Sequence, residues 1–194
     1  MSGHTPSSSI TSIVLTGFMG AGKTTVGALL AERLGWTFAD SDHLVESRSG
    51  LTVAAIFERD GEAAFRRMEA EAVQQTAGRE HVVLALGGGA LESPATREFL
   101  AELRHGRVVF LDAPLETLLG RCAGQPDAPV RPVLRDQERL AARWQARQPL
   151  YREAHLIVST AGRTPVAVVD RIVQELFGGS AAEAVIAGQR GGRE

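Results

Sequence analysis

A phosphate-binding motif near the N-terminus constrains this chain more than any other feature. Residues 17–24 read Gly-Phe-Met-Gly-Ala-Gly-Lys-Thr, which matches the pattern G-x-x-x-x-G-K-T, and Lys23 is the only lysine in the sequence. The glycines let backbone N–H groups turn towards phosphate oxygens, and a lysine at this place reaches the β- and γ-phosphates of a nucleotide. The hydroxyl of Thr24 is suited to ligate Mg²⁺. We therefore expect a nucleotide-binding loop at residues 17–24.

The residues on either side of the loop supply the context that the motif requires. Residues 9–16 predict a buried strand that leads into the loop, and residues 25–34 predict a helix that leaves it. A helix that begins at the loop directs the positive end of its dipole towards the same anion. The order of strand, loop and helix argues against a chance match of a glycine-rich turn.

The rest of the chain alternates between short apolar runs and helical patterns. Strands are predicted at residues 9–16, 36–39, 81–86, 107–111 and 156–158. Helices are predicted at residues 25–34, 41–49, 53–59, 62–77, 93–103, 114–121, 135–146 and 166–177. Continuous apolar strands separated by helices indicate an α/β fold, in which a parallel sheet is covered by helices on both faces.

Composition and charge are those of one ordinary globular domain. The chain has 194 residues, of which 44% are hydrophobic and 23% charged, and its net charge of -2 gives no sign of a nucleic acid or a membrane surface as partner. No apolar run is long enough for a spanning helix. The single cysteine, Cys122, cannot form an internal disulfide, which fits the cytoplasm. We expect a disordered lead at residues 1–9, the domain at 10–177, and a flexible or weakly helical tail at 178–194.

Two groups of polar or small residues follow predicted strands, where ligands gather in a parallel sheet. Asp40-Ser41-Asp42 follows the second strand, and Gly87-Gly88-Gly89 follows the third. The two carboxylates suit contacts to metal-bound water and to a substrate hydroxyl, but Asp and Ser also cap helices. The glycines suit close approach of a ligand to the backbone, but they also suit a tight turn. Both pairs of interpretations stay open at this point.

Three arginines are candidates for anion binding. Arg66 lies in a predicted helix, Arg147 follows another, and Arg131 lies in the Gly- and Pro-rich segment 123–134. That segment has the composition of a mobile lid, which would bring a cation onto a transferring phosphate. The alternatives are a solvated helix face for Arg66 and a favourable interaction with a helix C-terminus for Arg147.

Taken together, the motifs resemble those of the shikimate kinase family over residues 10–177. The segments that carry the resemblance are Gly20-Ala21-Gly22-Lys23-Thr24, Phe38-Ala39-Asp40-Ser41-Asp42, Phe65-Arg66-Arg67-Met68-Glu69, Leu86-Gly87-Gly88-Gly89, Arg131-Pro132-Val133-Leu134 and Arg147-Gln148-Pro149-Leu150-Tyr151-Arg152. The resemblance implies a five-stranded parallel sheet in the three-layer arrangement of nucleoside monophosphate kinases, with a mobile lid. It also implies a monomeric, cytoplasmic transferase that moves a phosphoryl group from ATP, assisted by Mg²⁺, to the 3-hydroxyl of shikimate, in aromatic amino-acid biosynthesis.

The resemblance assigns roles to individual residues of this chain. The catalytic residues would be Lys23, Asp42 and Arg131. Shikimate would be bound by Asp42, Arg66, Gly87, Gly88, Gly89 and Arg147. ATP would be bound by Met19, Gly20, Ala21, Gly22, Lys23, Thr24, Arg121, Arg131, Arg163 and Pro165. Thr24 and, through water, Asp40 would hold the Mg²⁺ ion.

Other classes of nucleotide-binding protein fit these motifs less well. A gluconate-type or nucleotide kinase shares the loop, sheet and lid, but it does not call for two arginines, an acid and a glycine turn together. A GTPase needs a second lysine for its guanine-binding motif, and the sequence has none. A remodelling ATPase needs an Asp-Glu pair after a strand, whereas Asp112 is followed by Ala113 and Pro114, which favour a helix start.

Overall fold

Five parallel strands form one sheet at the centre of the molecule. The computed structural model describes residues 10–123 and 137–188. The strands are β1 (Ser12–Thr16), β2 (Thr37–Asp40), β3 (Val82–Ala85), β4 (Gly106–Asp112) and β5 (Leu156–Ser159), in the order β2-β3-β1-β4-β5. Every neighbouring pair runs parallel. The predicted α/β fold with a five-stranded parallel sheet is therefore confirmed.

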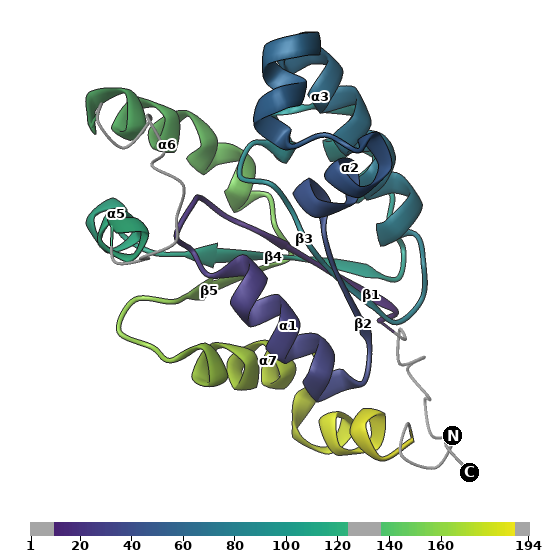
Figure 1. The fold of residues 1–194 in the computed structure, drawn as a ribbon. Helices are drawn as coiled ribbons and strands as arrows, with labels where there is room; N and C mark the ends of the chain where they lie inside the picture. The colour runs from purple at the N-terminus through teal and green to yellow at the C-terminus, as the bar shows by residue number, and fades with distance from the viewer. Residues whose placement is uncertain (1–9, 124–136, 189–194) are drawn as a thin grey trace.

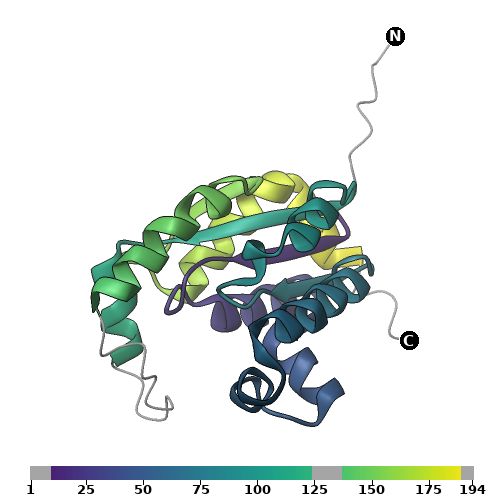
Figure 2. The ribbon, with the colours of Figure 1, turned by 90° about the horizontal axis from the view of Figure 1, so that it is seen from above.

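Helices cover both faces of this sheet, as Figure 1 shows. On one face, α1 (Lys23–Leu34) packs beside α7 (Pro165–Gly188). On the other face, α3 (Val53–Ala77) packs on β3 and β1 with α4 (Pro94–Ala101) next to it, and α6 (Gln137–Arg152) lies further along. The remaining helices are α2 (Ser41–Ser49), the 3₁₀ turn η1 (Ala90–Glu92) and α5 (Leu115–Ala123). Figure 2 shows α2 and the first half of α3 projecting from the sheet.

The central strands are buried on both faces, which explains their uninterrupted apolar sequences. All residues of β1 and of β3 are buried. Leu15 of β1 is in register with Ala85 of β3 and with Val109 of β4, and Asp40 of β2 is in register with Ala85. The carboxyl ends of β1, β2 and β3 therefore reach the same edge of the sheet. The segments that follow these strands meet there.

Two long helices are each broken at a glycine. Gly61 in α3 has a φ of 81°, so the helix consists of two parts that correspond to the two helices predicted at 53–59 and 62–77. In α7 the break lies at Gly178, where φ is 70°, and helical backbone continues to Gly188. The tail predicted at 178–194 therefore includes helical residues up to Gly188, and residues 189–194 lie outside the described part.

The bounds of α4 and of α6 differ from the predicted helices in ways that bear on the site. The helix predicted at 93–103 is α4, which spans Pro94–Ala101 and follows the 3₁₀ turn η1. It begins at Pro94 because Ser93 is its N-cap, which accepts a hydrogen bond from the Thr96 N–H, and because proline suits the first helical position. The helix predicted at 135–146 continues through Pro149 to Arg152. This extension places Arg147 and Tyr151 one helical turn apart on the same side of α6.

The described residues do not include every predicted segment. The lead at residues 1–9, Arg131 and the predicted lid at 123–134, apart from Ala123, lie outside them. Within the described ranges, none of the helices has the length and apolar character needed to cross a membrane.

We expect the contact between α1 and the sheet to limit the side chain at position 27. A Cβ atom on Gly27 would lie 2.5 Å from a ring carbon of Phe38 and 3.3 Å from a side-chain carbon of Leu15. Gly27→Val should therefore lower the free energy of unfolding by about 1–3 kcal/mol, the usual cost of overpacking. Urea unfolding followed by circular dichroism measures the change.

Gly120 in α5 supplies the matched control. A Cβ atom there would meet no other atom within 4 Å, so Gly120→Ala should raise the free energy of unfolding by about 0.5–1 kcal/mol through helix propensity alone. Equal effects at both positions would contradict the packing described between α1 and β2.

Candidate active site

One cleft of about 740 Å³ lies at the edge of the sheet where β1, β2 and β3 end. Every residue predicted for the site lines this cleft, except Arg131, which lies outside the described residues. The lining residues are Met19, Gly20, Ala21, Gly22, Lys23, Thr24, Thr25, Val26, Asp40, Asp42, Val53, Phe57, Phe65, Arg66, Leu86, Gly87, Gly88, Gly89, Arg121, Arg147, Thr160, Arg163, Pro165 and Val168. The fold thus brings together segments that are far apart in the sequence.

The loop between β1 and α1 has the backbone that its glycines predict. Gly20 and Gly22 have φ angles of 75° and 88°, in the left-handed region that favours glycine. Gly22 is also the residue that precedes α1, so the N-terminus of this helix faces the cleft. The ammonium of Lys23 donates to the carbonyl oxygens of Gly17 at 2.8 Å and Phe18 at 3.1 Å. Its charge therefore lies at the loop, where a polyphosphate would be bound.

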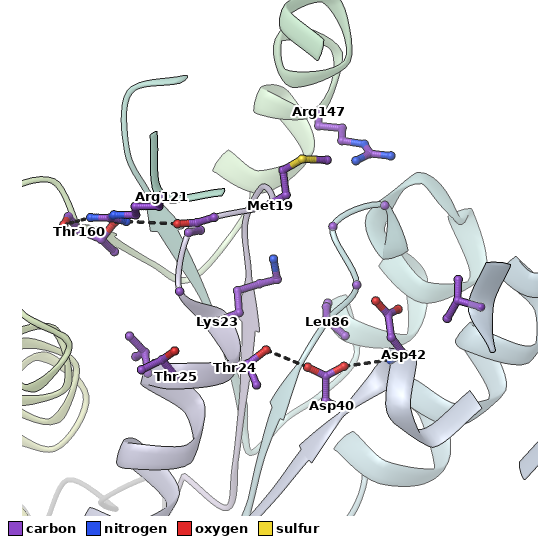
Figure 3. A pocket seen from close by; sticks show the side chains of 18 of the residues that line it. Met19, Lys23, Thr24, Thr25, Asp40, Asp42, Leu86, Arg121, Arg147 and Thr160 are labelled. Carbon is purple, nitrogen blue, oxygen red and sulfur yellow. Dashed lines mark hydrogen bonds between the residues drawn. The ribbon is translucent and has the colours of Figure 1, made fainter. Parts of the chain in front are cut away.

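Asp40 connects the loop to the start of α2. One carboxylate oxygen of Asp40 accepts from the Thr24 hydroxyl at 3.0 Å, and the other accepts from the Asp42 N–H at 3.1 Å. Asp40 is thus the N-cap of α2, and it is also the partner of Thr24 (Figure 3). The sequence left open whether Asp40 caps a helix or contacts metal-bound water, and this geometry is compatible with both interpretations.

The oxygen atoms of Thr24 and Asp40 fit the requirements of Mg²⁺. This ion prefers hard oxygen ligands and is usually held by one or two protein groups, with water and substrate phosphates as the other ligands. The described residues contain no cluster of three or more His, Cys, Asp or Glu side chains that could enclose a metal. A hydroxyl and a carboxylate beside a phosphate-binding loop therefore suit Mg²⁺ that arrives with a nucleotide.

Asp42 lies in the first turn of α2, and its carboxylate faces the same space as Lys23 (Figure 3). Burial raises the pKa of the Asp42 carboxyl, and the negative charge of Asp40 adds to this effect. Lys23 and Arg66 act in the opposite direction but do not cancel it. Asp42 is therefore a stronger base than an exposed aspartate, as suits a group that accepts a proton.

Arg66 is held by a glutamate that the sequence analysis did not single out. The Arg66 guanidinium donates to Glu69 at 2.6 Å, and Glu69 is 1% exposed. Burial raises the pKa of Glu69, although the charge of Arg66 and its hydrogen bond lower it. Glu69 also accepts from the Ser41 hydroxyl, which in turn accepts from the Gly87 N–H at 2.7 Å. Arg66 is thus fixed in the cleft rather than solvated on a helix face.

The glycine turn at residues 87–89 has no room for side chains at two of its three positions. A Cβ atom on Gly87 would lie 2.5 Å from a carboxylate oxygen of Asp42. A Cβ atom on Gly89 would overlap Arg66 and lie 2.8 Å from a guanidinium nitrogen of Arg147. The turn therefore lets an acid and two arginines approach one stretch of backbone, which is more than a tight turn would require.

Arg147 and Tyr151 join α6 to the glycine turn and to the residues that follow it. Arg147 is 7% exposed and donates to Glu92 through Nε at 3.0 Å and Nη2 at 2.9 Å. The Tyr151 hydroxyl donates to the Gly88 carbonyl at 2.5 Å, and its pKa is raised to about 12 by burial. Tyr151 is therefore a neutral donor at physiological pH.

At the other end of the cleft, Arg121 connects the phosphate-binding loop to the end of β5. Its guanidinium donates to the Thr160 carbonyl at 2.6 Å, to the Thr160 hydroxyl at 2.9 Å and to the Gly20 carbonyl at 3.3 Å. Arg163 is exposed and Pro165 begins α7, and both line the cleft beside Arg121. Asp112 ends β4 and is not among the lining residues in the described part of the chain.

Sequence reasoning missed three features of this site. Glu69 follows Arg66 by three residues on a helix, so helical spacing was a signal that could have paired them. Glu92 is separated from Arg147 by 55 positions, and no local pattern connects the two. No role in the site was predicted for the apolar residues Val53, Phe57 and Phe65, which line the cleft, and Phe57 is 36% exposed.

We expect the buried Asp42 carboxylate to reduce the stability of the folded protein at neutral pH. Because its pKa is raised in the folded state, the cost of ionising Asp42 is absent below its ordinary pKa of 3.8 and appears as the pH rises through the raised value. Asp42→Asn should therefore raise the free energy of unfolding at pH 7 by about 1 kcal/mol, a common gain when a functional-site group is neutralised. Urea unfolding at several pH values should show this gain shrinking towards pH 4.

The control is an aspartate whose pKa is shifted the other way. The hydrogen bond from Arg59 lowers the pKa of the exposed Asp60, so Asp60→Asn should bring no gain in stability at pH 7. A gain for Asp60→Asn equal to that for Asp42→Asn would contradict the burial argument.

The comparisons with known proteins agree with this geometry. The family model described as shikimate kinase matches residues 19–177. A shikimate kinase of Psychrobacter arcticus is 40% identical over 176 residues, which are 90% of this chain and 94% of the relative. A shikimate kinase of Thermus thermophilus is 44% identical over 168 residues, which are 86% of this chain and 90% of the relative.

A solved structure gives the same result in three dimensions. A shikimate kinase from Acinetobacter baumannii, in complex with shikimate, superposes with a TM-score of 0.79 at 39% sequence identity, covering 88% of this chain and 97% of the other. The family model spans most of the described chain, and the matched residues include residues 19–24 of the phosphate-binding loop and the glycine turn. The chain belongs to the shikimate kinase family.

Proposed function

We propose that the protein transfers the γ-phosphoryl group of ATP to the 3-hydroxyl of shikimate, assisted by Mg²⁺. One observation carries the proposal: an acid, Asp42, and two arginines, Arg66 and Arg147, surround a glycine turn in the same cleft as the phosphate-binding loop. Phosphorylation of a small, carboxylated polyol requires cationic side chains that bind its carboxylate and a base that accepts a proton from its hydroxyl. The shikimate complex of the Acinetobacter baumannii relative supports this choice of acceptor.

The nucleotide end of the cleft suits a polyphosphate. Backbone N–H groups of the loop, the N-terminus of α1 and the Lys23 ammonium would together stabilise negative charge that develops on the β- and γ-phosphates. Thr24, with Asp40 beside it, would hold Mg²⁺, which supplies charge neutralisation on the phosphates when bound. Arg121, Arg163 and Pro165 would border the adenine. Arg131, outside the described residues, stays the predicted catalytic cation of the lid.

The acceptor end suits a carboxylate and hydroxyls. Arg66 and Arg147 would bind the carboxylate of shikimate, and the backbone at Gly87, Gly88 and Gly89 would lie against its ring. Asp42 would hold the 3-hydroxyl and take its proton as the hydroxyl oxygen bonds to the γ-phosphorus. The bond from that phosphorus to the β,γ-bridging oxygen breaks in the same reaction, and ADP leaves. The raised pKa of Asp42 supports the role of proton acceptor.

The same proposal includes that the enzyme is cytoplasmic and acts as a monomer. The single cysteine suits a reducing compartment. Size-exclusion chromatography with light scattering tests the oligomeric state directly.

A panel of acceptors tests the reaction itself. We expect ADP release to depend on shikimate and on Mg²⁺, and to stay at background with gluconate, with nucleoside monophosphates or without an acceptor. A coupled assay measures ADP, and phosphorus NMR of the product identifies the phosphorylated hydroxyl. Turnover with gluconate or a nucleoside monophosphate but not with shikimate would instead favour the rival class of P-loop kinase.

We expect Asp42→Asn to lower kcat/KM for shikimate about a hundredfold or more, the scale typical of a positioned acid–base group. The variant keeps the shape of the side chain but loses its charge. ATP affinity should change little, because Lys23, Thr24 and the loop N–H groups remain. Since Asp40 is the residue that caps α2, a loss of this size cannot come from a missing cap. Initial rates and ATP titrations measure both quantities, and a silent variant would remove Asp42 from the proposed mechanism.

A further inference from the structure

Glu92 is a carboxylate that pairs with both arginines of the acceptor end. It accepts two hydrogen bonds from Arg147, at 3.0 Å and 2.9 Å, and lies 3.6 Å from a guanidinium nitrogen of Arg66. Among the ion pairs of the described residues, it is the carboxylate shared by these two arginines. Two like charges that converge on one turn repel each other, and a carboxylate between them offsets that repulsion.

The contact with Glu92 holds one edge of the Arg147 guanidinium. Glu92 is bonded to Nε and Nη2, which form one edge of the planar group. The third nitrogen, Nη1, lies 3.7 Å from the position that a Cβ of Gly88 would take, and Gly88 lines the cleft. One edge of Arg147 is therefore held by the protein, and the remaining nitrogen is directed towards the cleft.

Glu92 itself lies next to the glycine turn, outside the lining of the cleft. Arg66, Gly89 and Arg147 line the cleft, whereas Glu92 is not among the lining residues, and its side chain is 39% exposed. A carboxylate that competed with an acceptor for Arg147 would have to occupy the cleft. The position of Glu92 therefore favours support of Arg147 over competition with the substrate.

The charge state of Glu92 suits the support of the Arg147 guanidinium. Burial by itself would raise the pKa of Glu92, but its hydrogen bonds with Arg147 and the charges of Arg147 and Arg66 bring the pKa below its ordinary value. Glu92 therefore stays ionised at neutral pH. Tyr151 lies one helical turn after Arg147 on the same face of α6 and donates to the Gly88 carbonyl. The helix α6 is therefore fixed at two points, to Glu92 of η1 through Arg147 and to the glycine turn through Tyr151.

We infer that Glu92 is a positioning residue, which holds the Arg147 guanidinium so that Nη1 faces the carboxylate of the acceptor. This inference rests on the proposed function for the identity of the acceptor. The acceptor carboxylate does not react, so its interaction with Arg147 is equally strong in the ground state and in the transition state. That interaction therefore contributes to substrate binding rather than to the chemical step.

Glu92→Gln tests the inference through the kinetics of the full-length enzyme. We expect KM for shikimate to rise about tenfold, which corresponds to the loss of one charge-assisted hydrogen bond. We expect kcat to stay within about twofold and KM for ATP to stay unchanged, because the effect is confined to ground-state binding of the acceptor. Thermal unfolding of the variant confirms that it is folded.

Glu62→Gln is the matched control. Glu62 also contacts Arg66, at 3.3 Å, but its side chain is 63% exposed, and among the ion pairs of the described residues it is paired with Arg66 and not with Arg147. Its replacement should change KM for shikimate less than about twofold, as is usual for an exposed ion pair. An unchanged KM for shikimate in Glu92→Gln would overturn the inference. A lower KM would overturn it too, because it would make Glu92 a competitor of the substrate.

Crystal structures of the wild type and of Glu92→Gln test the positioning without reference to turnover. We expect the Arg147 guanidinium to leave its wild-type place in the variant, and an unmoved guanidinium would overturn the inference. Failure of the wild type to phosphorylate shikimate would refute the proposed function instead. In that case the two crystal structures still decide whether Glu92 positions Arg147.

Discussion

The close approach of side chains to the glycine turn at residues 87–89 is the constraint on which the acceptor end of the cleft depends. Side chains at Gly87 and Gly89 would occupy the places of Asp42 and of the two arginines. The turn can lie there because β3, which it follows, ends at the same edge of the sheet as β1 and β2. Parallel strands thus deliver the phosphate-binding loop, the acid of α2 and the turn to one cleft, while α3 and α6 supply the arginines.

Charge balance explains how so many ionisable groups share this small space. Each arginine has a carboxylate that keeps its guanidinium in place: Glu69 for Arg66, and Glu92 for Arg147. Burial raises the pKa of the Asp42 carboxyl, and the charge of Asp40 adds to the effect. Both guanidinium groups are therefore held by carboxylates, whereas the ionised form of the Asp42 carboxyl is made less favourable. This division suits a site that must hold one anionic group firmly and change the protonation of another.

Structural features that depend on neighbouring residues were predicted correctly from the sequence. The phosphate-binding loop, the strands and the parallel sheet follow from glycine spacing and apolar runs, and the fold class is confirmed. The break in α3 at Gly61 likewise follows from one residue that favours a left-handed backbone. The predicted ends of helices differ from the structure where tertiary contacts decide them. The extension of α6 through Pro149 accompanies the bonds of Arg147 and Tyr151 to η1 and the glycine turn.

The sequence by itself determined that this protein binds a nucleotide phosphate on a parallel α/β sheet, because the loop motif and the strand pattern are encoded in neighbouring residues. It also supplied the acid, the arginines and the glycines as candidates. Only the tertiary structure decided that Asp40 both caps α2 and contacts Thr24, and that Glu92 joins Arg147 to Arg66. Such contacts join residues far apart in the chain. They exist because the sheet sets the distance between elements, and sequence spacing carries no record of that distance.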